Sequence, residues 1–335
     1  MSGRLTTDSP LSGASRSPAP RGRTTRIAPS PTGALHLGNA RTFLVNWALA
    51  KQQGWRILLR IEDLDGPRIK AGAAQQAIAT LQWLGIDWEE GPIWQSADLT
   101  PYRDALAKLA AGGEIYPCRC TRSQLMKAAL SAPHAGDYEL RYSGACRPAE
   151  HTTFSWDDPA HADAAWRLRT PDEVIAFNDR FAGRQSHNPQ QLVGDFVVAT
   201  KAGRPSYQLA VVVDDARQGV TDVVRGDDLL PSTPRQMLIY ERLGLGSVPE
   251  YTHLPMVIGE DGRRLAKRHG DTRIDTYRQQ QVSRERVLGL IAEWCGIGKR
   301  QPFKLAEFLA AFDLALLPKE PVVFTAADDA WLKQG

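Results

Sequence analysis

The sequence predicts an α/β protein built on a Rossmann-type parallel sheet. The chain has 335 residues, of which 42% are hydrophobic and 24% charged, as is typical of a folded protein with a large core. Residues 24–28 predict a short strand, residues 38–53 a helix that Gly54 ends, and residues 55–61 an apolar strand. A strand, a helix and a second strand in this order form a βαβ unit, so the strands should be parallel, with a ligand at their carboxyl ends.

The rest of the chain divides into further segments. We expect residues 1–24, rich in Ser, Pro, Gly and Arg, to be a disordered tail; a transit peptide has a partly similar composition, but the prolines disfavour an amphipathic helix. Residues 25–115 and 191–275 are expected to form the two halves of a nucleotide-binding domain, with an inserted subdomain at 116–190 between them and a helical segment at 276–335.

Individual elements follow from the hydrophobic pattern. Helices are expected at 71–85, 102–112 and 233–243, strands at 194–200, 207–213 and 220–225, and a glycine-rich turn at 259–262. Within 276–335, the spacing of Val287, Leu288, Ile291 and Trp294 is typical of a helix with one apolar face.

Charge and composition exclude several classes of protein. Lys and Arg total 41 against 38 Asp and Glu, and the small excess lies in the first 24 residues, so a uniformly basic coat for nucleic acid is excluded. No apolar run approaches the roughly 18 residues of a membrane-spanning helix. The four cysteines are unevenly spaced, which favours a reducing, cytoplasmic compartment and a metal site over a disulfide framework.

Two loops carry the residue types that handle phosphate. The loop at 29–39 contains His36, Gly38 and Asn39 where the first strand leads into the first helix, and a helix start attracts anions. The second loop, 263–270, is basic and follows a glycine-rich turn. Alone, the first is more often a structural loop and the second a solvated charge run. Together they place cations on two sides of one cleft.

Three motifs carry a resemblance to a known family. Residues 26–41 resemble the HIGH motif of class I aminoacyl-tRNA synthetases in its glutamate-specific form, residues 264–268 resemble the KMSKS loop, and residues 60–68 match the glutamyl branch. The resemblance covers residues 24–335. Asn39 replaces the second histidine of HIGH, while Arg264 and Ala266 replace the first lysine and the serine of KMSKS; Lys267 is retained.

The resemblance implies activation of glutamate by ATP. Such a reaction needs no general base, because the ionised carboxylate attacks the α-phosphorus directly, so the protein must position the reactants and stabilise charge. His36, Lys267 and Arg268 are the expected catalytic residues. His36, Gly38, Asn39 and Lys267 are expected to bind ATP, which brings Mg²⁺ as its counterion.

Glutamate itself requires two cationic partners for its two carboxylates and one anionic or hydroxyl partner for its ammonium group. Arg26 and Arg225 can contact the carboxylates, Glu62 the ammonium, and Tyr207 can add a hydroxyl. Alone, Arg225 and Glu62 would more often form surface ion pairs, and Tyr207 would be a core residue of a strand. The residues that the resemblance places around glutamate are Arg26, Ile27, Ala28, Pro29, Ser30, Glu62, Tyr207 and Arg225.

Cysteines predict one structural zinc ion in the insertion. Cys118, Cys120 and Cys146 offer three soft ligands within 29 residues. By spacing, His134 or His151 could supply the fourth ligand, and buried free cysteines remain an alternative. The resemblance to the glutamyl-queuosine branch of the family implies Tyr142 as the fourth ligand. Cys295, beside Trp294, is expected to be a core residue.

Length distinguishes this chain from an ordinary tRNA-charging enzyme. Only 68 residues follow Lys267, fewer than the roughly 100 expected of a separate anticodon-binding domain. The resemblance is to shortened glutamyl-tRNA synthetases that attach glutamate to queuosine in the anticodon loop of tRNA(Asp), so ATP, L-glutamate and this tRNA are the expected partners of a monomer. The alternatives are a truncated glutamyl-tRNA synthetase acting on tRNA(Glu) and a non-catalytic zinc module that binds RNA; a small-molecule adenylyltransferase is disfavoured by residues 60–68.

Overall fold

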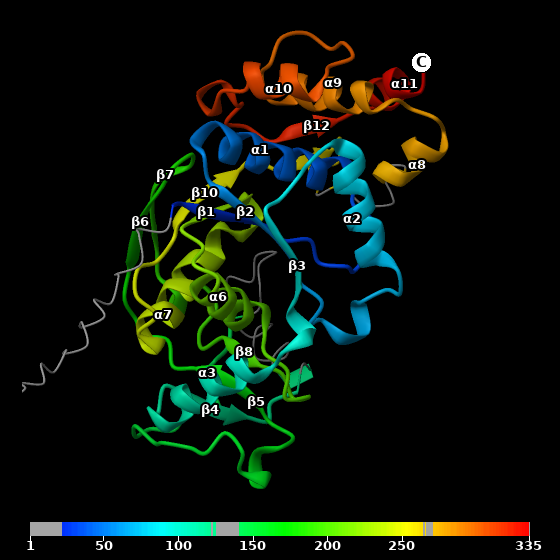
Figure 1. Cartoon of the computed structure of the whole chain (residues 1–335). Coiled ribbons are helices and arrows are strands. Elements are labelled where there is room, and N and C mark those ends of the chain that lie inside the picture. The colour runs from blue at the N-terminus through cyan, green and yellow to red at the C-terminus, as the bar shows by residue number, and fades with distance from the viewer. Residues whose placement is uncertain (1–21, 122, 125–140, 264, 266–270, 335) are drawn as a thin grey trace, which may run out of the picture.

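A seven-stranded, largely parallel sheet forms the centre of the computed structural model, which describes residues 22–121, 123–124, 141–263, 265 and 271–334 (Figure 1). The strand order is β3-β2-β1-β9-β10-β6-β7, and only the β6–β7 pair is antiparallel. Along this order the bounds are Glu90–Trp94, Arg56–Ile61, Thr24–Ile27, Asp222–Gly226, Glu250–Leu254, Ile175–Asp179 and Gly183–His187. The α/β class with a parallel sheet is therefore confirmed.

Helices cover both faces of this sheet. In Figure 1, α1, α2 and the C-terminal helices lie on one side, α6 and α7 on the other, and α3 lies beyond them. The α-helices are α1 (Leu37–Gln53), α2 (Ala73–Leu84), α3 (Thr100–Ala111), α5 (Pro189–Leu192), α6 (Tyr207–Arg217), α7 (Thr233–Leu243), α8 (Ile274–Gln279), α9 (Arg284–Trp294), α10 (Leu305–Ala311) and α11 (Ala326–Lys333). Among the described helices, none is long and apolar enough to cross a membrane.

The first helix has well-defined signals at both ends. His36 is its N-cap, and Gly54 ends it in the left-handed conformation with φ 66°, which glycine adopts without strain. Apolar side chains of α1, such as Leu44, pack on Ile27, Ile57 and Leu59 of the sheet. Because side chains alternate along a strand, the neighbours of these three residues in β1 and β2 point to the opposite face, toward α6.

Residues 207–213 and 250–254 differ from the sequence-based expectation. The segment predicted as a strand at 207–213 is the helix α6, and Tyr207 is its first residue. Its run of buried residues, Leu209 to Val213, has no clear period, so the pattern alone does not distinguish a buried strand from a buried helix. Strand β10 was not expected at all, although its five residues include only one charged side chain, Glu250.

The segment expected as an insertion, 116–190, is divided between two sheets. Its strands β6 and β7 extend the large sheet, whereas β5 (Ala165–Leu168) pairs with β4 (Ile115–Cys118) and β8 (Val197–Ala199) in a separate antiparallel sheet of three strands. The hydrophobic residues of this small sheet pack with α3, α6 and α7 in a second core.

The C-terminal segment is helical apart from one strand. Strand β12 (Val322–Phe324) pairs in parallel with β11 (Val257–Gly259), which follows β10. Phe308 and Leu332 of α10 and α11 are fully buried in the same core as α1. The last 60 residues are therefore part of the body that surrounds the large sheet.

Candidate active site

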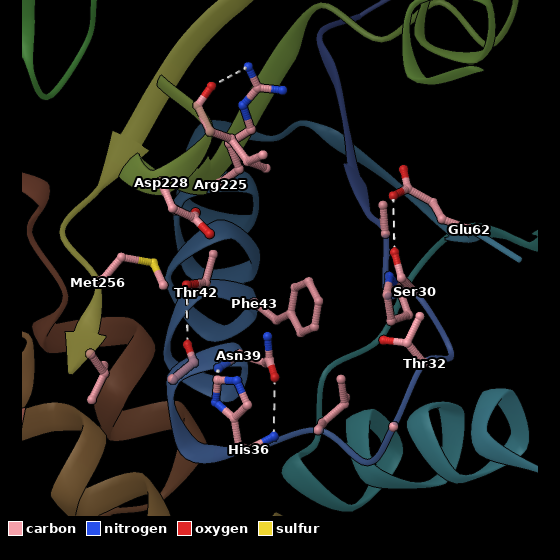
Figure 2. Close-up of a pocket in the computed structure, with 18 of the residues that line it drawn as sticks. Ser30, Thr32, His36, Asn39, Thr42, Phe43, Glu62, Arg225, Asp228 and Met256 are labelled. Atoms are coloured by element: carbon pink, nitrogen blue, oxygen red, sulfur yellow. Dashed lines mark hydrogen bonds between the residues drawn. The ribbon is translucent and has the colours of Figure 1, made fainter. Parts of the chain in front are cut away.

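A cavity of about 430 Å³ opens at the carboxyl ends of β1 and β9, where helix α1 begins (Figure 2). The predicted site residues that line it are Arg26, Ala28, Pro29, Ser30, His36, Gly38, Asn39, Glu62, Tyr207 and Arg225. The side chain of Ile27, also predicted near glutamate, is instead fully buried in the core beneath α1. Lys267 and Arg268 lie outside the described residues, as do Arg264 and Ala266.

His36 and Asn39 form a reciprocal cap at the start of α1. The backbone N–H of Asn39 donates to His36 Nδ1 at 3.4 Å, and the backbone N–H of His36 donates to Asn39 Oδ1 at 3.2 Å. Because Nδ1 accepts a hydrogen bond, the neutral imidazole carries its proton on Nε2. The cap thus combines an imidazole donor with the positive end of a helix of 17 residues, a combination that favours phosphate.

Buried charges from β1, β2 and α6 form one network. Asp215 Oδ1 accepts from Arg60 Nη1 at 2.7 Å and from Arg26 Nε at 3.3 Å. Arg60 also donates to Glu62 Oε1 at 3.2 Å, and the hydroxyl of Ser30 donates to Glu62 Oε2 at 3.5 Å. Arg26 and Arg60 are only 4% and 0% exposed, so Asp215 offsets a large desolvation cost.

Glu62 connects this network to the cavity. Burial raises the pKa of its carboxyl above the ordinary 4.5, and the positive charges of Arg60 and Arg26 offset only part of that rise. A carboxylate at the wall of the cavity can hold an ammonium group. The prediction that Glu62 could be a surface ion pair is excluded, since it is 9% exposed.

Arg225 lies in a different electrostatic setting. Its guanidinium is 5% exposed and donates to His253 Nε2 at 2.9 Å, Gln236 Oε1 at 2.9 Å and Thr233 Oγ1 at 2.9 Å. It also donates to the carbonyl of Leu229 at 3.4 Å. Within the part of the chain that the structure describes, every acceptor of Arg225 is uncharged. This buried cation therefore remains available for an anionic group in the cavity.

Tyr207 lies at the edge of the cavity and not in a strand core. As the first residue of α6 it is 39% exposed, and its side chain lines the cavity. Sequence reasoning missed other lining residues, among them Thr42, Phe43, Asp228 and Met256. Asp228 could have been found, because it lies two residues after the end of β9 and polar residues after parallel strands tend to line the ligand site.

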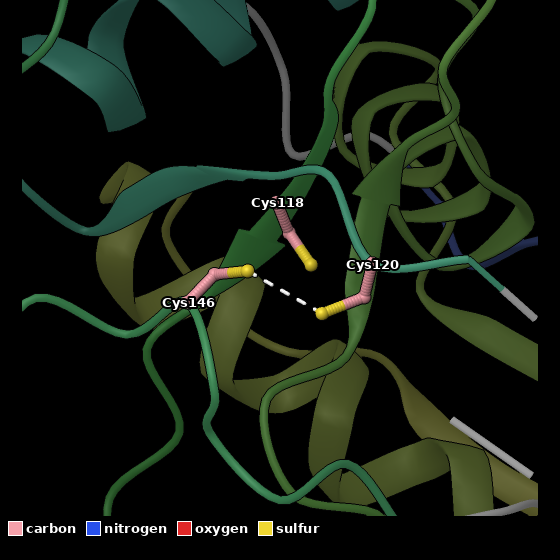
Figure 3. Close-up of side chains that lie close together, drawn as sticks. All are labelled: Cys118, Cys120 and Cys146. Carbon is pink, nitrogen blue, oxygen red and sulfur yellow. Dashed lines mark hydrogen bonds between the residues drawn. The ribbon is translucent and has the colours of Figure 1, made fainter. Parts of the chain in front are cut away.

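The three cysteines predicted as metal ligands come together at the small sheet (Figure 3). The sulfur atoms of Cys118, Cys120 and Cys146 all lie within 4.8 Å of one another. The hydroxyl of Tyr142 lies 3.5 Å from Cys118 Sγ and accepts from the backbone N–H of Cys146 at 2.7 Å. His151 is exposed and its imidazole lies against Gly113, while His134 is outside the described residues.

Ionisation within this cluster is uneven. Burial raises the pKa of Cys120 to about 11, together with its contacts to the other two thiols. Burial also opposes ionisation of Cys146, but hydrogen bonds from Cys120 and Tyr142 outweigh it and lower its pKa to about 7. Cys295 is fully buried beside α1, which confirms its expected place in the core.

A model of the catalytic domain of class I tRNA synthetases, of the E and Q group, matches residues 23–329. A glutamate tRNA ligase from Elizabethkingia meningosepticum, solved in complex with its amino acid, superimposes with a TM-score of 0.76 at 27% identity, covering 93% of this chain and 68% of that one. The fold, the cavity at α1 and these matches define a class I tRNA synthetase, an ATP-dependent ligase.

Relatives narrow the class further. The chain is 48% identical to a glutamyl-Q tRNA(Asp) synthetase from Symbiobacterium thermophilum over 92% of its own length and 98% of the relative's. It is 38% identical to a glutamate–tRNA ligase from Geobacter sulfurreducens, covering 92% of this chain and 64% of that protein. The chain belongs to the glutamyl-Q tRNA(Asp) synthetase family, so the family predicted from the three motifs is confirmed.

Replacing Asp215 should destabilise the protein strongly. The variant Asp215→Ala removes the carboxylate that Arg26 and Arg60 share, and a buried cation without its partner typically costs ~3–5 kcal/mol. Urea unfolding monitored by circular dichroism measures this loss of free energy of unfolding. The exposed Asp157 provides a control, since Asp157→Ala should change the stability by no more than about 0.5 kcal/mol. A loss for Asp215→Ala equal to that of the control would contradict the network.

Proposed function

We propose that this protein activates L-glutamate with ATP to glutamyl-adenylate in the absence of tRNA, and then transfers the glutamate to queuosine in the anticodon loop of tRNA(Asp). The observation that carries the proposal is the cavity at the start of α1, where one wall offers phosphate donors and the other offers Arg26, Glu62 and Arg225. The similarity of the whole chain to relatives named for this reaction supports the same conclusion.

In the first step, a carboxylate oxygen of glutamate attacks the α-phosphorus of ATP, and the bond to the bridging oxygen breaks to release pyrophosphate. His36 is proposed to donate from Nε2, and the positive end of the α1 dipole lies at the same wall of the cavity. The backbone N–H groups of Leu37 and Asn39 already donate to the carbonyl of Thr272 and to His36 Nδ1. Lys267 and Arg268 are proposed as the cations of the opposite loop. Class I synthetases use ATP with Mg²⁺, which neutralises part of the phosphate charge.

Glutamate recognition is assigned to the opposite wall. Arg225 has only uncharged acceptors in the described structure, so it is proposed to bind one substrate carboxylate. Arg26 is proposed to bind the other carboxylate. Glu62 is proposed to bind the ammonium group, held in place by Arg60 and Ser30. Tyr207, at the rim, can add its hydroxyl. In the second step, a hydroxyl of the cyclopentenediol ring of queuosine attacks the activated carbonyl and releases AMP.

The cysteine cluster fits a structural zinc ion. Three thiols and a phenol oxygen form a donor set of the kind that zinc accepts, and the hydroxyl of Tyr142 already lies beside Cys118 Sγ. We therefore propose Cys118, Cys120, Cys146 and Tyr142 as the ligands. The ion would hold Tyr142 and Cys146 against Cys118 at the end of β4; its proposed role is in stability, because the four ligand residues do not line the cavity.

One alternative has its own support. The similarity to a glutamate–tRNA ligase would also suit charging of tRNA(Glu). Exchange of labelled pyrophosphate into ATP, with glutamate and no tRNA, tests the first step, and a zinc module that only binds RNA would show none. Transfer of labelled glutamate to tRNA(Asp) with queuosine, to tRNA(Asp) without it and to tRNA(Glu) tests the second step. We expect label only on the first; label on tRNA(Glu) would support the alternative.

Glu62 should set both the affinity for glutamate and its pH dependence. In Glu62→Gln the ammonium group loses a charged partner worth ~1.5–3 kcal/mol, so the KM for glutamate should rise about 10- to 100-fold while that for ATP stays constant. Because the pKa of Glu62 is raised, its protonation begins at a higher pH than for an ordinary carboxyl. Glutamate KM of the wild type should therefore increase as pH falls through this range, and the variant should lack that increase. Parallel pH profiles would contradict the assignment.

Removal of a proposed zinc ligand should release the metal. We expect Cys146→Ser to lower the zinc content, measured by inductively coupled plasma mass spectrometry, from about one ion per chain to a small fraction, and to lower the melting temperature. Cys295→Ala serves as the control, because Cys295 lies in the core beside α1, and it should keep its zinc. Equal zinc contents in the two variants would refute the site.

A further inference from the structure

We propose that His253 and Asp179 are positioning residues that hold the guanidinium of Arg225 in the orientation that receives a substrate carboxylate. The inference rests on the proposed function, since it concerns how glutamate is recognised. It adds two residues that do not line the cavity and that no motif of the sequence indicated.

The three side chains form a continuous buried chain across neighbouring strands. Arg225 Nε on β9 donates to His253 Nε2 on β10 at 2.9 Å, and His253 Nδ1 contacts Asp179 Oδ2 on β6 at 2.7 Å. Their exposed fractions are 5%, 1% and 4%. This chain of hydrogen bonds runs from β6 of the edge hairpin, through β10, to β9 at the wall of the cavity; β9 is the third strand from the edge strand β7.

Donor and acceptor roles along this chain are fixed by arginine. A guanidinium has only N–H donors, so His253 Nε2 must accept, and the ring proton must lie on Nδ1, where Asp179 accepts it. A protonated imidazole would instead place a second cation and a second donor against Arg225 Nε. Burial lowers the pKa of His253 and the charge of Arg225 lowers it further, while the carboxylate of Asp179 opposes both effects. The neutral ring is therefore favoured.

These contacts fix the plane of the Arg225 guanidinium group. His253 holds Nε, Gln236 accepts one Nη1 hydrogen, and Thr233 with the carbonyl of Leu229 accepts from Nη2. Among the described residues, these contacts leave the second Nη1 hydrogen for a ligand in the cavity. The ring of Tyr251 stacks on His253 and lies 5.1 Å from the guanidinium carbon, which supports both groups from one side. Pre-orientation of this kind lowers the entropy cost of binding.

Asp179→Asn tests the inference with little change of shape. Asp179 Oδ1 accepts from the backbone N–H groups of Phe181 and Ala182 at 2.9 and 2.7 Å, and asparagine can keep these contacts. Its amide would, however, place a donor against His253 Nδ1, which would then have to accept, so the ring proton would move to Nε2. The N–H groups of His253 Nε2 and Arg225 Nε, both donors, would then face each other. In glutamate-dependent pyrophosphate exchange, we expect the KM for glutamate to rise about tenfold, the loss of one charged hydrogen bond, with the KM for ATP unchanged.

A pair of substitutions at His253 separates positioning from packing. Glutamine can place its side-chain oxygen where Nε2 was and accept from Arg225, so His253→Gln should keep most of the affinity for glutamate. Asparagine is too short and reaches only the position of Nδ1, so His253→Asn should show the same rise in glutamate KM as Asp179→Asn. If these hydrogen bonds only joined β6 to β10, both variants would affect stability and leave the ratio of the glutamate KM to the ATP KM unchanged.

Asn178→Ala provides the matched control, because Asn178 is exposed on β6 next to Asp179, and it should behave as the wild type. Melting curves show which variants are folded; if Asp179→Asn is unfolded, the His253 pair decides. Unchanged glutamate KM in folded Asp179→Asn, or equal values for the two His253 variants, would overturn this inference alone. Absence of exchange in the wild type would overturn the proposed function and, with it, the inference.

Discussion

Burial of three arginines on one face of the parallel sheet is the constraint on which the site depends. Arg60, Arg26 and Arg225 come from adjacent strands β2, β1 and β9, and side-chain alternation turns all three away from α1. Each guanidinium would cost several kcal/mol to desolvate without partners. Asp215 on α6 compensates the first two, and polar, uncharged groups surround the third. One face thus contains both an ion network and, within the described structure, a buried cation whose acceptors are all uncharged.

This arrangement also accounts for the place of α6. The helix must present Asp215 to β1 and β2, which brings its first residue, Tyr207, to the rim of the cavity. On the opposite face the sheet is mainly apolar toward α1, although the buried hydroxyl of Thr25 donates to Asn46 of that helix. One face packs in the hydrophobic core, and the other carries the buried charges that we propose to bind glutamate.

The C-terminal segment contributes to the cavity as well as to the core. Val257 lines the cavity and pairs with Val322 of β12, so the chain end supports the wall that precedes the basic loop at 263–270. The cysteine cluster is a separate unit, built where β4 ends and 142–146 pass beside it. The cavity and the small sheet are thus built by different parts of the chain.

The sequence by itself determined the βαβ unit, both ends of α1, the loop at His36, the place of Arg26, Glu62 and Arg225 at the cavity, and the cysteine set. These features depend on short-range patterns: a period of 2 or 3.6, a cap, a turn or a motif of a few residues. Tertiary structure alone decided that 207–217 is a helix, that β10 and β12 exist, and that β6–β7 extend the large sheet. It also decided that Asp215 and His253 contact arginines that are distant in sequence. Those outcomes depend on pairing between segments up to 189 residues apart, as for Arg26 and Asp215, and no local pattern encodes the partner of a strand or of a buried charge.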